Sequence, residues 1–86
     1  MRLDKFLKVS RLIKRRTLAK EVADQGRVTI NGNKAKAGTE VTKGDEVTIR
    51  FGQKLVTIKV NEVQEVIRKQ EAGMMYEVIK EEEVKE

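Results

Sequence analysis

The first 20 residues concentrate cationic side chains that could bind an anionic polymer. They hold eight Lys or Arg residues and one acidic residue, Asp4, for a net charge of +7. The basic residues are Arg2, Lys5, Lys8, Arg11, Lys14, Arg15, Arg16 and Lys20. Such a concentration of one sign is typical of a segment with an anionic partner, nucleic acid being the first candidate and an acidic membrane surface the second.

Charge is distributed unevenly along the 86 residues. Residues 1–60 hold 15 basic and 6 acidic side chains, a net +9, whereas residues 61–86 hold 4 basic and 8 acidic side chains, a net −4. A chain of this length is expected to form one compact domain with a small core. We therefore expect the binding domain over residues 1–60, and an acidic C-terminal extension over residues 61–86 that packs on it or trails from it.

Composition argues against most catalytic chemistry. The chain has no Cys and no His, so it lacks a disulfide framework, a thiolate nucleophile, a zinc–thiolate site and the commonest general base. Its carboxylates are dispersed or gathered in the acidic tail, and no glycine-rich phosphate loop is present. A metal-dependent nuclease or RNA-modifying enzyme is therefore disfavoured, and we expect no cofactor and no metal.

No segment predicts insertion into a membrane. The chain lacks an apolar run near the ~20 residues that cross a bilayer, and its first residues do not resemble a secretory signal. We expect a cytoplasmic protein.

Apolar spacing predicts two helices that position the cationic residues. Over residues 2–12, Leu3, Phe6 and Leu7 begin one helical face that continues to Ser10 and Ile13, with the basic side chains off that face. A second helix is expected over residues 17–25, with Thr17 as N-cap, an apolar face of Leu18, Ala19, Val22 and Ala23, and Gly26 as its left-handed end. The triplet at residues 14–16 would then lie beside unpaired helix amides, which favours an anion site.

After Gly26 the apolar period changes from 3.6 to 2. Alternating residues at 28–30, 47–51 and 56–60, separated by turns that include Asn31-Gly32, predict three or four short, mostly antiparallel strands packed under the two helices. In the tail we expect the last strand to continue to about residue 67. A short helix over about residues 70–83 is expected from the spacing of Ala72, Met75, Tyr76 and Ile79.

The order of these features resembles the S4 RNA-binding domain family. Residues 2–7 read RLDKFL, residues 26–32 read GRVTING and residues 44–47 read GDEV, so the resemblance covers residues 2 to 49. It implies an α+β fold, with two N-terminal helices, the αL motif of the family, on a small mostly antiparallel sheet. Where the family often has Ser-Arg before its second helix, this chain has Arg15-Arg16-Thr17.

The resemblance also implies which residues bind RNA. The RNA-facing surface would comprise Arg2, Asp4, Lys5, Lys8, Arg11, Arg15 and Arg16, flanked by Lys14 and Lys20, with Asn31 and Lys34 at its margin. Asp4 has a second interpretation, as a first-turn carboxylate that orients neighbouring cations, and Asn31 as a turn residue that tolerates positive φ.

The whole chain is similar to the stand-alone members of the family that act in ribosome-associated quality control. That similarity implies a monomeric, non-catalytic factor that binds large-subunit rRNA and peptidyl-site tRNA on the large ribosomal subunit. It implies the tailing factor RqcH as a partner, in the C-terminal alanine tailing of stalled chains. The alternative is a general ribosome assembly or recycling factor that binds rRNA alone.

Overall fold

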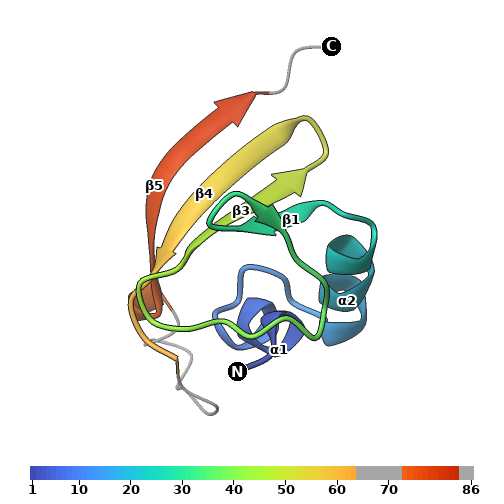
Figure 1. Cartoon of the computed structure of the whole chain (residues 1–86). Coiled ribbons are helices and arrows are strands. Elements are labelled where there is room, and N and C mark those ends of the chain that lie inside the picture. The colour runs from blue at the N-terminus through green and yellow to red at the C-terminus, as the bar shows by residue number, and fades with distance from the viewer. Residues whose placement is uncertain (64–72, 84–86) are drawn as a thin grey trace.

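Two short helices and a five-stranded sheet make up the computed structural model, which describes residues 1–63 and 73–83 (Figure 1). The elements are α1 (Leu3–Val9), α2 (Arg16–Asp24), β1 (Val28–Ile30), β2 (Asn33–Lys34), β3 (Glu46–Phe51), β4 (Lys54–Val60) and β5 (Tyr76–Glu83). The strand order is β2-β1-β3-β4-β5, and every neighbouring pair is antiparallel. The expected α+β architecture of two helices on an antiparallel sheet is confirmed.

The core lies between the helices and one face of the sheet. Leu3, Phe6 and Leu7 of α1 are fully buried and belong to one apolar cluster with the inward residues of β1, β3 and β4. In β3 the buried Val47 and Ile49 alternate with more exposed residues, as the period of 2 requires. The residues between and after them, Thr48 and Arg50, therefore point to the opposite face of the sheet.

Helix α1 ends earlier than its apolar spacing predicts. It stops at Val9, because Arg11 adopts a left-handed conformation with φ of 63°. The amide of Ile13 donates to the carbonyl of Leu7 across 3.0 Å, which returns the chain to the core. Ile13 is therefore buried, as predicted, although it lies outside the helix.

Helix α2 begins one residue earlier than predicted, and two expectations for it are wrong. Arg15 occupies the N-cap position without a side-chain cap, so Thr17 lies inside the helix. Leu18 is 49% exposed, so the buried face consists of Ala19 and Ala23. Two alanines allow the helix to approach the core closely, whereas Leu18 lies about 100° away around the helix axis from Ala19.

The expected C-terminal helix is wrong where the structure describes the chain. Residues 76–83 form β5, which pairs with β4 from Val60↔Tyr76 to Lys54↔Glu83, with an irregularity near Thr57 and Ile58. The open edge of β4 offers backbone hydrogen bonds that a helix would leave unmade. The last central strand ends at Val60 and does not continue through residues 61–63; the remainder of that prediction, residues 64–67, lies outside the described residues.

Candidate nucleic-acid interface

A buried carboxylate organises the cationic surface of the two helices. Asp4 lies in the first turn of α1, and its side chain is only 3% exposed. Its Oδ1 accepts from the Lys5 amide at 2.8 Å and lies 3.3 Å from Nε of Arg2. Its Oδ2 accepts from Nη2 of Arg2 and from Nε of Arg16, each at 3.4 Å. One aspartate thus joins a residue that precedes α1 to the first residue of α2.

The backbone around Arg2 is held by a distant loop. The amides of Leu3 and Asp4 donate to the carbonyls of Thr39 at 2.8 Å and Ala37 at 3.1 Å. Arg2 also forms an isolated antiparallel bridge with Glu40. These bonds fix the position from which the Arg2 side chain extends.

The two guanidinium groups remain accessible although they are anchored. The Arg2 and Arg16 side chains are 53% and 49% exposed, while the carboxylate between them is buried. Ion pairs of partly exposed groups contribute little to folding, about 0–1 kcal/mol each. The main consequence of the contact is geometric, because a single negative charge holds two cationic forks side by side and leaves their other N–H groups available to an anion.

The other predicted residues of the first 20 lie on the same two helices or on the connection between them. Lys5 is half-buried on α1, and the rest are exposed on α1, on the connection between the helices or on α2. The exposed ones are Lys8, Arg11, Lys14, Arg15 and Lys20. Figure 1 shows α1 and α2 side by side, so these residues are carried by one helical layer.

Asn31 and Lys34 lie on the β1–β2 hairpin, outside the two helices. Asn31 has a φ of 52°, and its side chain is used within the protein. Its Nδ2 donates to Asp45 Oδ1 at 3.1 Å, and its Oδ1 accepts from the Glu46 amide at 2.9 Å. The geometry therefore favours the turn role of Asn31, whereas Lys34 is exposed.

Asp45, in the turn before β3, is the carboxyl group among residues 1–63 and 73–83 whose pKa is clearly shifted. The Thr42 amide donates to Asp45 Oδ2 at 2.9 Å and lowers the pKa of Asp45 below 3.8, against the opposing effect of partial burial. The Asn31 amide and the Thr42 hydroxyl lower that pKa further. Asp45 thus stabilises the turn that leads into β3.

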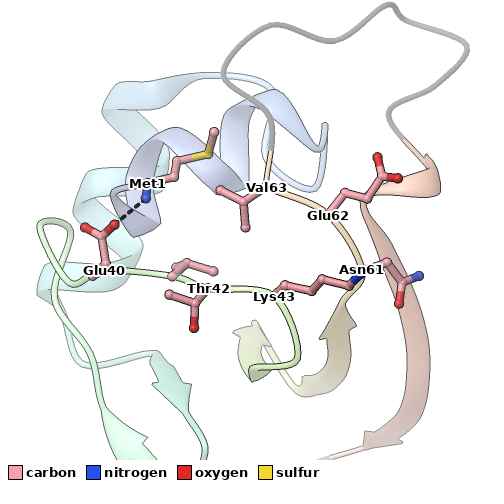
Figure 2. Close-up of a pocket in the computed structure, with 8 residues that line it drawn as sticks. Met1, Glu40, Thr42, Lys43, Asn61, Glu62 and Val63 are labelled. Atoms are coloured by element: carbon pink, nitrogen blue, oxygen red, sulfur yellow. Dashed lines mark hydrogen bonds and ion pairs between the residues drawn. The ribbon is translucent and has the colours of Figure 1, made fainter.

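A cavity of about 470 Å³ lies beside the start of the chain (Figure 2). Glu40 approaches the Met1 amine at 2.6 Å, and Lys43 extends toward Asn61. Residues 1–63 and 73–83 contain no cluster of three or more Asp, Glu, His or Cys side chains able to hold a metal ion. No helix in that part of the chain is long and apolar enough to span a bilayer.

Comparisons with known proteins agree with this geometry. A model of the S4 domain family matches residues 1–47. The chain is 69% identical over 86 residues to the RQC P-site tRNA stabilizing factor of Bacillus subtilis, with full coverage of both chains. It is 70% identical over 84 residues to the factor of the same name from Halalkalibacterium halodurans, covering 98% of this chain and 96% of that one. The trimeric structure of Vibrio cholerae heat shock protein 15 superposes with a TM-score of 0.84 and 34% identity, covering 91% of this chain and 80% of that one.

Proposed function

The chain belongs to the S4 domain family, and we propose that it is an RNA-binding factor that stabilises tRNA in the peptidyl site of the large ribosomal subunit. The observation that carries the proposal is the pair of arginines, Arg2 and Arg16, held together by the buried carboxylate of Asp4. Its relatives match it over nearly the whole chain, and their name, RQC P-site tRNA stabilizing factor, supports tRNA as the bound RNA and the peptidyl site as the place where it is bound.

The mechanism is positional. Two guanidinium groups anchored on one carboxylate lose little additional conformational freedom when they meet phosphate oxygens, so less binding energy is spent on ordering them. Lys5, Lys8 and the connection between the helices extend the cationic surface, so that the protein follows the backbone of a folded RNA. Contact with both rRNA and tRNA would restrict the movement of the tRNA between rounds of chain extension.

Selectivity for RNA would come from shape. A-form helices hide the base edges of their major groove, so proteins recognise them through phosphates and 2′-hydroxyls. Phe6 is buried in the core, and Phe51 and Tyr76 lie on strands β3 and β5. Base stacking therefore contributes little at the helices.

Three finer statements belong to the same proposal. The site comprises the Asp4 cluster and the surrounding basic residues of the first 20 residues. The factor acts as a monomer in the cytoplasm on subunits blocked by peptidyl-tRNA, and supports C-terminal alanine tailing by RqcH. It contributes binding and orientation, and no chemical step is assigned to it.

Co-sedimentation with large subunits tests the proposal. Wild-type protein is expected to bind subunits that carry peptidyl-tRNA more tightly than empty subunits. Arg16→Ala is expected to weaken that binding about tenfold or more. It should also reduce the magnitude of the salt slope, the slope of log affinity against log salt concentration, by about 1. Lys59→Ala, an exposed lysine on β4, is the control for loss of one charge. Equal affinity for loaded and empty subunits would instead favour an assembly or recycling factor that recognises rRNA alone.

A further inference from the structure

The end of the sheet at β5 carries the opposite charge from the helices. β5 is the last strand in the order β2-β1-β3-β4-β5, so one of its edges pairs with β4 and the other bounds the described sheet. Its eight residues include four glutamates and one lysine, a net charge of −3. Residues 77–83 are all exposed. Figure 1 shows β5 at one side of the molecule and α2 at the other, with the remaining strands between them.

The backbone of this outer edge is suited to pairing with a further strand. In an antiparallel ladder, alternate residues direct their N–H and C=O groups away from the neighbouring strand. At the end of a sheet these groups form a template for another chain. β5 has eight residues, whereas β2 at the other end of the sheet has two. The edge at β5 is therefore the longer template.

Two apolar side chains are exposed on the same strand. Val78 pairs with the fully buried Ile58, so its side chain lies on the core-facing side of the sheet. It is nevertheless 48% exposed, and the neighbouring Ile79, which falls at the irregularity in the ladder, is 50% exposed. An additional strand beside β5 would remove part of this apolar surface from water, which favours its addition.

The glutamates determine which kind of strand this edge can accept. Antiparallel pairing of β5 with a second copy along its whole length would place Glu77 opposite Glu82 of that copy. Like charges directly opposite one another destabilise a sheet. The same negative charge repels the phosphates of RNA and attracts a cationic segment. The edge is thus protected against copies of itself and is selective for a basic strand.

The ion pairs along this edge would compete only weakly with such a segment. Nζ of Lys54 lies 3.3 Å from Oε2 of Glu81, and Nζ of Lys80 lies 2.6 Å from Oε1 of Glu82. The four side chains are between 49% and 62% exposed. Ion pairs of such exposed groups contribute little to stability, so an incoming lysine or arginine can replace the existing partner of either glutamate.

We propose that the outer edge of β5 binds an extended, lysine- or arginine-rich segment of another protein as a sixth strand. Backbone hydrogen bonds would supply affinity, and the glutamates would select basic segments over neutral or acidic ones. Apolar residues at alternate positions of that segment would cover Val78. Because β5 and α2 lie on different sides of the domain (Figure 1), the protein could hold RNA on its helices and a basic protein at this edge.

Titration of the whole protein with two peptides of equal charge tests the proposal. An octapeptide of alternating lysine and valine can form a strand. The same octapeptide with its two central valines replaced by proline lacks two backbone donors and cannot complete a ladder. We expect the alternating peptide to bind about tenfold more tightly than the proline peptide, because only the former can add to the sheet. Amide shifts in nuclear magnetic resonance spectra should fall on residues 76–83.

Two double variants separate charge on β5 from charge elsewhere. Glu77→Gln with Glu82→Gln neutralises part of the edge, and Glu21→Gln with Glu46→Gln removes the same charge from α2 and β3. The edge variant should bind the alternating peptide about fivefold more weakly than wild type does. The control variant should bind it almost as wild type does, and both variants should bind an RNA duplex alike. Equal urea midpoints would show that the substitutions leave the fold intact.

Four results would overturn the proposal. Equal binding of the two peptides, or shifts confined to residues outside β5, would show attraction by charge without strand addition. An edge variant that binds the alternating peptide as the control variant does would show that the glutamates do not select it. A free protein that sediments as a dimer and takes up no peptide would show that a second copy occupies the edge. Loss of RNA-duplex binding in the edge variant alone would place the edge in the RNA surface. These readouts do not depend on tRNA stabilisation, so either proposal can fail while the other stands.

Discussion

Oδ2 of Asp4 lies 3.4 Å from Nε of Arg16, and this contact joins the first turn of α1 to the first residue of α2. Twelve positions separate the two residues in sequence. The contact fixes the position of Arg16, at the start of α2, relative to Arg2, which precedes α1. It therefore sets the spacing of the two cations that would meet an RNA.

Replacing Asp4 separates positioning from simple charge. Asp4→Asn raises the net charge by one, so attraction alone would tighten RNA binding. We expect binding to weaken about threefold to tenfold, because the guanidinium groups of Arg2 and Arg16 lose their common anchor. Glu21→Gln, an exposed change of the same charge on α2, should leave binding unchanged or slightly tighter. Tighter binding by Asp4→Asn in a fluorescence anisotropy titration would contradict the positioning role.

Salt dependence should report the number of phosphate contacts. About six contacts predict a slope near −5 in a plot of log affinity against log salt, by the duplex-DNA rule. The combination of Arg2→Ala with Arg16→Ala should reduce the magnitude of that slope by about 2. A lower affinity with an unchanged slope would show that these residues act through the fold and not by meeting phosphates.

Arg11 offers a way to separate backbone strain from charge. Its φ of 63° is unfavourable for any residue with a Cβ, by about 1–2 kcal/mol. Arg11→Gly and Arg11→Ala remove the same charge, so both should lower the salt slope by about 1. The glycine variant should be about 1 kcal/mol more stable than the alanine variant in urea denaturation. Equal stability of the two variants would contradict a left-handed residue 11.

The C-terminal segment should contribute to the core through one methionine. Met75 is fully buried, whereas its neighbour Met74 is 64% exposed. Met75→Ala should lower the free energy of unfolding by about 2–5 kcal/mol. Met74→Ala should change it by less than about 0.5 kcal/mol. Similar unfolding midpoints for the two variants in urea would contradict the packing of this segment on the domain.

Asp45 should make stability depend on acid pH. Its pKa in the folded protein is lowered from 3.8 by the Thr42 amide, so the folded state favours the ionised carboxylate. That stabilisation is complete above the unfolded pKa and is lost as pH falls through the lower folded value. Asp45→Asn should therefore show a smaller loss of urea midpoint than wild type between about pH 5 and pH 2. Glu21→Gln, which removes one exposed carboxylate, is the control, and an Asp45→Asn curve parallel to wild type would contradict the assignment.

Local patterns in the sequence predicted most of the elements. The spacing of Leu3, Phe6 and Leu7 identifies the buried face of α1, and Gly26 marks the end of α2 with a φ of 77°. The change to a period of 2 identifies β1, β3 and β4. The concentration of cations in the first 20 residues indicated an anionic partner, and the motifs at residues 2–7, 26–32 and 44–47 indicated the family. Each of these signals depends on neighbours within a few positions, so the sequence carries it directly.

Contacts between distant residues decided the rest. Tyr76 and Ile79 have helical spacing, yet residues 76–83 form a strand because the open edge of β4 supplies their hydrogen-bond partners. The sequence left two interpretations of Asp4, and the structure favours the anchoring one because Arg2 and Arg16 converge on a buried carboxylate. In each case the free energy of a side chain or strand depends on a surface built by residues far along the chain, which no local pattern encodes.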